Sequence, residues 1–456
     1  MSSRSNKIYL LKEEKVSTAL LKLGIPTMIG MMVSALYNLV DAFFVGKLGT
    51  PQIGAVSVVY PLGVVLLGIG LLFGAGASSY LSRLLGNKSY TEASECASTA
   101  LITSVVMGIA VIVLMIKFLE PILIILGATK TILPYAKEYA FIFVVGLVFN
   151  VFNITLNNII TSEGASIISM TAMLSGGVAN IIFDPLLIFG FSMGVKGAAI
   201  ATLIARIISF VIYLTYLLSG NSVFKFKLRN FKPSIKVYSE ILKIGIPMLV
   251  FQLLSSITFG ITNSLAGVYG DEAVAALGIV TRIMNLFCMM IFGFLKGYQP
   301  FVGYNLGAKN YQRVEDATKT ALKWGFAFCI STAMILILFR IPIMRSFSTQ
   351  DETVVIIGAK AIIANALVFI GMAYQVLHGT RFLAFGKAKQ GGLISIGRQG
   401  AFFIPIVFIF TAMFKLNGLI LAQPISDICS ILMVVILVKC EKQEDTNILI
   451  SLKNKI

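Results

Sequence analysis

Residues 22–26 read Lys22-Leu-Gly-Ile-Pro26, and residues 243–247 read Lys243-Ile-Gly-Ile-Pro247, an offset of 221 positions (243 − 22 = 221). Two further pairs keep this offset: Leu85-Gly86-Asn87-Lys88 with Leu306-Gly307-Ala308-Lys309, and Gly197 with Gly418. Short Gly-containing pairs are common in membrane helices, but three matches in one register over most of the chain indicate a duplication. We therefore expect two halves of the same fold and the same orientation.

Long apolar runs fill both halves. Of the 456 residues, 57% are hydrophobic and 12% are charged, against about 25% charged in a soluble domain. Breaks at polar, Gly and Pro residues predict twelve membrane spans: 16–46, 52–82, 93–118, 131–158, 164–190, 195–218, 238–268, 273–304, 316–340, 354–379, 388–413 and 416–438. The predicted fold is an all-α membrane protein of two six-helix bundles, related by a pseudo-two-fold axis along the membrane normal.

The same pattern predicts the domain organisation. We expect an N-lobe over residues 1–218, a basic cytoplasmic linker over 219–237, a C-lobe over 238–440 and a cytoplasmic tail over 441–456.

The net charge of +17 comes from basic groups that lie between spans on one predicted side of the membrane, such as the run from Lys225 to Lys236. This distribution predicts cytoplasmic N- and C-termini in a bacterial inner or plasma membrane. A nucleic-acid binder would gather its basic and aromatic residues in one module instead, so we expect no nucleic-acid partner.

The chain lacks the sequence motifs of several classes of enzyme and nucleotide-binding protein. The chain has no G-x-x-x-x-G-K-[ST], G-x-S-x-G or H-E-x-x-H pattern. Its five cysteines show no C-x-x-C spacing, which favours a packing role. We therefore expect no enzyme and no bound cofactor. Energy for any transport must come from an ion gradient or from the substrate's own gradient.

Polar side chains inside the predicted spans are the candidate functional groups, because an ionisable residue in lipid is costly unless it faces protein or water. Asp41 ends a stripe at helical spacing, Ser34, Tyr37, Asn38 and Asp41. Asn180 and Asp184 are one turn apart in the fifth span, and the fourth span carries Tyr139, Asn150, Asn153 and Asn157. Such oxygen ligands suit Na⁺ or a proton, and the alternative is that they only hydrogen-bond the helices together.

The second half differs at these positions. With the offset of 221, Asp41 corresponds to Thr262, Asp184 to Pro405 and Asn157 to His378, the only histidine. Coupling is therefore expected in the first half. Arg206 and Asp427 are also equivalent, and we predict either an ion pair between the lobes or two separate cytoplasmic positions. Flexible and aromatic side chains suit a cavity for varied ligands, although core packing is the alternative for each. The expected lining is Met31, Tyr37, Asn38, Asn153, Gln252, Met284, Phe287 and His378.

The combined motifs resemble the multidrug and toxic compound extrusion (MATE) family, in particular bacterial exporters related to the staphylococcal one. They are Gly24-Ile-Pro26, Tyr37-Asn38-Leu-Val-Asp41, Gly74-Ala-Gly-Ala-Ser-Ser79, Glu163-Gly164, Asn180-Ile-Ile-Phe-Asp184-Pro185, Gln299-Pro300 and Gly303-Tyr-Asn305-Leu-Gly307. The resemblance implies a V-shaped cavity with alternating access. It also implies a cation site at Asp41, Asn180 and Asp184, which would be the ligands if the ion is Na⁺, joined by Tyr139, Asn157 and Thr202.

The resulting expectation is a secondary active exporter that exchanges small cationic or amphipathic molecules for H⁺ or Na⁺ and works as a monomer in the bilayer. One alternative is a lipid-linked oligosaccharide flippase of the same superfamily, which should carry more basic residues facing the cavity. The other is a membrane scaffold or receptor that transports nothing, which would have no need of two buried aspartates.

Overall fold

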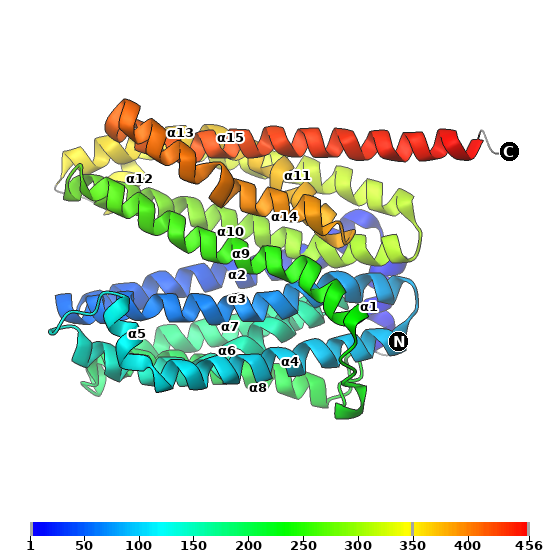
Figure 1. The fold of residues 1–456 in the computed structure, drawn as a ribbon, viewed down its shortest axis with the longest axis horizontal. Helices are drawn as coiled ribbons and strands as arrows, with labels where there is room; N and C mark the ends of the chain where they lie inside the picture. The colour runs from blue at the N-terminus through cyan, green and yellow to red at the C-terminus, as the bar shows by residue number, and fades with distance from the viewer. Residues whose placement is uncertain (1–2, 348–350, 454–456) are drawn as a thin grey trace. The chain divides into compact units, whose positions relative to one another are not determined.

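A computed structural model describes residues 3–347 and 351–453, and all regular elements in that part of the chain are helical. Eleven of these helical runs are long and apolar enough to cross a membrane. The last run, Ala388–Glu441, has 54 residues, and its backbone leaves the helix at Lys415, where φ is 53°. Dividing that run at Lys415 gives the twelve passes that the sequence predicts (Figure 1).

The chain separates into two compact units. The first contains the residues up to Leu253, together with Cys288–Ala317 and Ala384–Gly386, and the second contains the rest. The elements of the first are α1 (Ser3–Lys12), α2 (Val16–Gly46), α3 (Thr50–Gly86), α4 (Tyr90–Lys117), α5 (Leu119–Ile125), α6 (Leu133–Ser162), α7 (Ser166–Pro185), η1 (Leu186–Gly190), α8 (Gly194–Leu218) and η2 (Leu228–Asn230). Within this unit α6 packs against α3, α4 and α8, and α7 packs against α2 and α8 (Figure 1).

The first unit also includes the first part of α9 (Ile235–Gly267) and the last part of α10 (Asp271–Gly307). Glycines let these segments approach α3 and α2 closely. A Cβ on Gly245 of α9 would lie 2.8 Å from the Leu72 carbonyl carbon, and one on Gly297 of α10 would lie 2.5 Å from the Gly24 nitrogen. Any larger side chain at either position would push the helices apart. The two compact units therefore do not coincide with the two predicted repeats, because the first unit includes parts of α9 and α10. The boundaries of the repeats stay a prediction.

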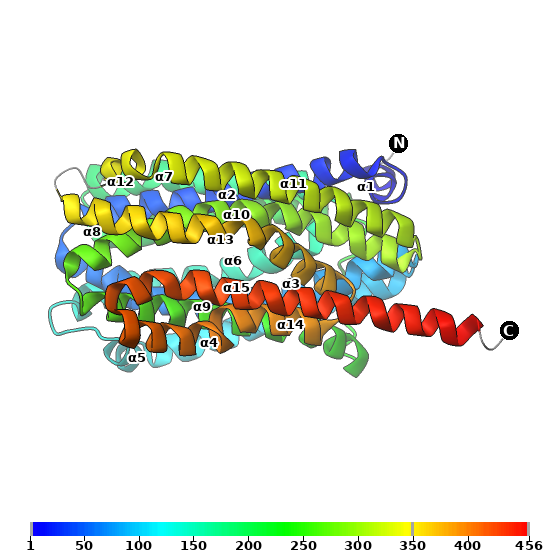
Figure 2. The same ribbon diagram turned by 90° about the horizontal axis from the view of Figure 1, so that it is seen from above.

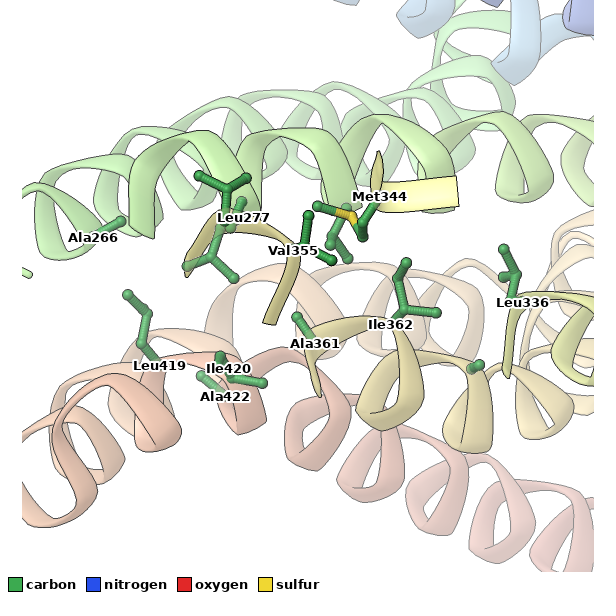
Figure 3. Close-up of a cluster of buried hydrophobic side chains, with 14 of the residues drawn as sticks. Ala266, Leu277, Leu336, Met344, Val355, Ala361, Ile362, Leu419, Ile420 and Ala422 are labelled. Carbon is green, nitrogen blue, oxygen red and sulfur yellow. The ribbon is translucent and has the colours of Figure 1, made fainter. Parts of the chain in front are cut away.

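The second unit is built from the remaining parts of α9 and α10, most of α11 (Tyr311–Leu338) and α13 (Glu352–Ala384), and all of α12 (Arg340–Phe347), α14 (Ala388–Ile396), η3 (Gly397–Ala401) and α15 (Phe403–Lys453). Its apolar core gathers buried side chains such as Leu277, Met344, Ile362 and Leu419 (Figure 3). The final helix continues to Lys453 (Figure 2), so residues 441–453 of the predicted tail are helical.

Glu163 ties the ends of the first unit together. Its carboxylate is fully buried and accepts hydrogen bonds from the Tyr216 hydroxyl, the Ser222 hydroxyl at 2.9 Å and the Val223 backbone N–H at 2.6 Å. The Lys7 ammonium of α1 lies 3.6 Å away. One carboxylate therefore fastens α1, the end of α8 and the start of the linker to the end of α6.

Candidate functional site

Three helices of the first unit bring the predicted polar residues together. Asp41 comes from α2, and Asn180 and Asp184 from α7, where a spacing of four residues places them on one face. Tyr139 on α6 is buried beside them and interacts electrostatically with both carboxylates. Immediately after Asp184 and Pro185 the helix widens into the π-helical segment η1, a distortion that is common at functional sites.

The Asp41 and Asp184 carboxyl groups are neighbours that interact electrostatically with one another. Asp184 is fully buried and accepts a hydrogen bond from the Asn180 amide at 3.2 Å. Three buried oxygens still lack a hydrogen-bond partner among the described residues: one each from Asp41, Asn180 and Asp184. Buried polar atoms are almost always satisfied, so this oxygen-lined group fits a small cation or a shared proton.

Arg206 places a fixed positive charge next to this pair. Its guanidinium donates to the Phe143 carbonyl at 3.2 Å and lies over the Phe143 ring at 4.5 Å. Asn153 donates to the Arg206 carbonyl at 2.9 Å, which holds this turn of α8 against α6. The guanidinium interacts electrostatically with Asp41 but forms no ion pair with it within 4.0 Å. Two carboxyl groups and one guanidinium leave the ionised cluster with one net negative charge.

Of the two alternatives predicted for Arg206 and Asp427, the structure gives no support to the ion pair, because Asp427 has another partner. Asp427 binds Arg398 of the second unit at 2.8 Å and accepts a hydrogen bond from Gln423 at 2.9 Å. Arg398 lies in η3, next to α15, so Asp427 finds its counter-charge within its own unit. A charge buried in a low dielectric pairs with the nearest opposite charge, and equivalent places in a repeat do not make two residues neighbours.

Asn157 belongs to a second polar cluster, which also contains Ser169, Tyr213 and Lys296. Its amide group donates to the Ser169 hydroxyl and, at 2.6 Å, to the Tyr213 hydroxyl, while its carbonyl accepts from the Lys296 ammonium. Ser169 precedes Asn180 by 11 residues on α7 (180 − 169 = 11), a rise of about 16 Å. The structure therefore separates Asn157 from the Asp41–Asp184 pair, with which the sequence analysis had grouped it.

Sequence reasoning missed Lys296. The signal was present, because this lysine interrupts the apolar run Phe292-Gly-Phe-Leu-Lys296. It has no ion pair with a carboxylate among the described residues, and its only hydrogen-bond partner there is neutral. A half-buried ammonium without a carboxylate partner costs stability, so its presence inside an apolar run points to a functional role.

We expect Lys296→Met to raise the stability of the protein by about 1–3 kcal/mol, because it removes this desolvation cost. Export should fall at the same time. Thermal unfolding in detergent and dye efflux measure the two effects. Lys117→Met, at an exposed position, is the control. A variant that loses stability would show that the ammonium contributes to packing.

The remaining predicted residues lie in several different surroundings. Met284 and Phe287 pack against the apolar core of the second unit, and His378 is buried against the Tyr374 ring at 4.3 Å. Asn38 is exposed and donates to the Ser34 carbonyl of its own helix. Tyr37 interacts electrostatically with Asp41 and Arg206. Thr202, Met31 and Gln252 are half-buried.

The ligand set favours a monovalent ion. The part of the chain that the structure describes has no group of three or more His, Cys, Asp or Glu side chains that could hold a metal. Two carboxylates and one amide oxygen, with a guanidinium nearby, carry too little negative charge for a tightly held divalent ion and suit Na⁺ or H⁺ better.

Comparison with known proteins shows what the whole chain is similar to. The MatE family model matches residues 26–186 and 247–409. The Multidrug export protein MepA of Staphylococcus aureus (strain N315) is 30% identical, over 98% of this chain and 99% of that protein. A MATE crystal structure in complex with MaL6 aligns with a TM-score of 0.90 at 25% identity, over 95% of this chain and 98% of that one. An outward-facing multidrug resistance MATE family transporter of the MOP superfamily aligns with a TM-score of 0.89 at 26% identity, over 95% and 97%.

Proposed function

Because this chain belongs to the MatE family and is a multidrug efflux transporter of the membrane, we propose that it couples export to the entry of H⁺ or Na⁺ at Asp41 and Asp184. The observation that carries the proposal is the pair of neighbouring carboxyl groups, each of which, like Asn180, has one buried oxygen without a hydrogen-bond partner among the described residues. Its relatives are named as multidrug exporters, so the flippase alternative is not favoured.

The charge of the cluster supports exchange of one monovalent cation. With both carboxylates ionised beside Arg206, the cluster has one net negative charge, which a single H⁺ or Na⁺ neutralises. Two carboxylates in contact repel each other in a low dielectric unless a cation or proton lies between them. Binding of the cation should therefore favour one arrangement of α2 and α7, and its release another. This difference in cation affinity between the two conformations is what couples cation entry to substrate export.

We propose that the substrates include organic cations. The buried ionisable side chains at this site are mainly acidic, and Tyr139 stacks on Phe143 at 5.4 Å. Aromatic faces beside a negative charge attract cations. Both repeats lie in one chain, so a monomer can alternate access alone.

The distribution of basic residues indicates how the protein is oriented in the membrane. An even number of passes puts both termini on one side, and the basic linker follows the end of α8 on that side. We propose that this side is cytoplasmic.

Dye efflux from energised vesicles tests the proposal. The vesicles are oriented so that their lumen corresponds to the cytoplasm. A proton gradient and a sodium gradient, each directed into the lumen, are imposed in separate experiments. One of the two should accelerate the loss of ethidium. A rate that is the same with and without both gradients would rule out cation coupling while leaving the fold assignment intact.

Arg206→Met gives a prediction for ion affinity. Two unit charges about 8 Å apart interact by about 2 kcal/mol at an effective dielectric of about 20, so removing the guanidinium should lower the Na⁺ concentration for half-maximal export by about tenfold or more. Arg206→Lys retains the charge and is the control. No change in the sodium dependence of Arg206→Met would show that the guanidinium does not set the charge of the site.

A further inference from the structure

The linker between α8 and α9 is held against α4 by its backbone. The Lys225 N–H donates to the Ser94 hydroxyl at 3.1 Å, and the Lys232 N–H donates to the Thr99 hydroxyl at 3.1 Å. Within the linker, the Asn230 amide donates to the Lys225 carbonyl at 2.6 Å. These hydrogen bonds hold the backbone of residues 225–232 against α4, and the held backbone in turn sets where its side chains point.

The charges of this segment divide into two groups. Lys232 and Lys236 are neutralised by Glu95 and Glu92 of α4. Lys225, Lys227 and Arg229 are exposed and form no ion pair with any described residue. Three adjacent cations without carboxylates make an anion-attracting surface next to the membrane.

Apolar side chains accompany these cations. Leu228 is 84% exposed and Ile235 is 90% exposed, although large apolar groups at an ordinary aqueous surface are usually better covered. Ser98, Leu101 and Ile102 of α4 line a cavity of about 140 Å³ together with Phe226, Lys227 and Leu228. One basic residue at a cavity with mainly apolar walls suits a ligand that is charged at one end and apolar along the rest.

The depth of the cavity matches the edge of a bilayer. With 28 residues, α4 is about 42 Å long and exceeds a hydrocarbon core of about 30 Å. The excess length allows its first turns to extend among the headgroups, and Ser98–Ile102 follow two to three turns later, toward the boundary of the hydrocarbon. A linker at this depth meets both lipid phosphates and the upper parts of acyl chains.

We infer that the linker surface formed by Lys225, Lys227, Leu228 and Arg229 binds an anionic phospholipid. Lys227 and Arg229 contact the phosphate, and the upper part of an acyl chain covers Ile102 and Leu228. The lipid would fix the linker, and with it the joint between the two repeats, to one leaflet. This inference goes beyond the export function and does not depend on the identity of the coupling ion.

Native mass spectrometry of the full chain tests the site with an equimolar mixture of phosphatidylglycerol and phosphatidylcholine. We expect the wild type to retain phosphatidylglycerol preferentially. Each basic residue near the surface contributes about a factor of five to the attraction, so K227Q/R229Q should reduce the preference by about tenfold or more. The matched control is K130Q/K196Q, which removes two exposed lysines before α6 and at the start of α8, at the other end of the unit.

The variants separate the possible results. Leu228→Gln should weaken retention of both lipids, because it removes apolar contact and leaves the charges in place. Excess glycerophosphoglycerol, which has the headgroup phosphate but no acyl chains, should not displace the lipid. Displacement by that soluble anion, an unchanged preference in K227Q/R229Q, or an equal loss in K130Q/K196Q would each overturn the inference.

Discussion

Asp184→Asn should abolish gradient-driven export while leaving the protein folded. An asparagine can neither release a proton nor supply the negative charge that holds Na⁺. Removing one partner from a buried charged group costs about 2–5 kcal/mol of binding free energy, which corresponds to a loss of cation affinity of about thirtyfold to more than a thousandfold. Dye efflux under an imposed gradient, with thermal unfolding of the same preparation, measures both properties.

The partner residue gives the control for this first prediction. Asp41→Asn should have the same effect, and the double variant should be no worse than either single one, because groups that act as a unit are not additive. Asp271→Asn, at an exposed position at the start of α10, should export normally. Substantial export by Asp184→Asn that still responds to the gradient would show that the coupling site lies elsewhere.

Glu163→Ala should destabilise the protein more than any other single change considered for the first unit. It leaves the donors of Tyr216, Ser222 and Val223 without their acceptor. It also removes the counter-charge of Lys7, whose pKa is lowered by burial and raised again in part by Glu163. Breaking a buried charge pair in this way costs about 3–5 kcal/mol, and for a chain of this size we expect a fall in Tm of about 3–5 °C.

Glu120→Ala is the matched control for this second prediction. Glu120 also pairs with a lysine, Lys137, but both side chains are largely exposed, and such a pair contributes about 0–1 kcal/mol. Thermal unfolding followed by circular dichroism compares the two variants. Equal shifts would mean that the Glu163 network adds no more stability than a surface ion pair.

The sequence predicted most of the architecture because the signals are local. Apolar length and basic loops identify the passes, and the expected first span, 16–46, coincides with α2. The constant offset of 221 reveals the duplication. Asp41 and Asp184 were found because a carboxylate inside an apolar run is rare and helical spacing shows which neighbours share its face.

The failures concern contacts between helices. Spacing places Asn157 on a polar face but does not give the height at which α6 meets α7, so its separation from Asp184 was not foreseen. The repeat does not single out Lys296, because the second-half equivalents of Asp41 and Asp184 are Thr262 and Pro405. The packing of α9 and α10 segments on α3 and α2 depends on close backbone contacts such as that of Gly297, and the sequence pattern does not show which helix a glycine faces.

The most direct test of the account is countermovement of the cation in proteoliposomes that start with no ion gradient. An outward gradient of ethidium should drive H⁺ or Na⁺ inward through the wild-type protein, followed with an internal pH dye or with radioactive Na⁺, and Asp184→Asn should show no such movement. Ethidium export by the wild type without any opposing cation movement, or undiminished cation movement in Asp184→Asn, would contradict coupling at the Asp41–Asp184 pair.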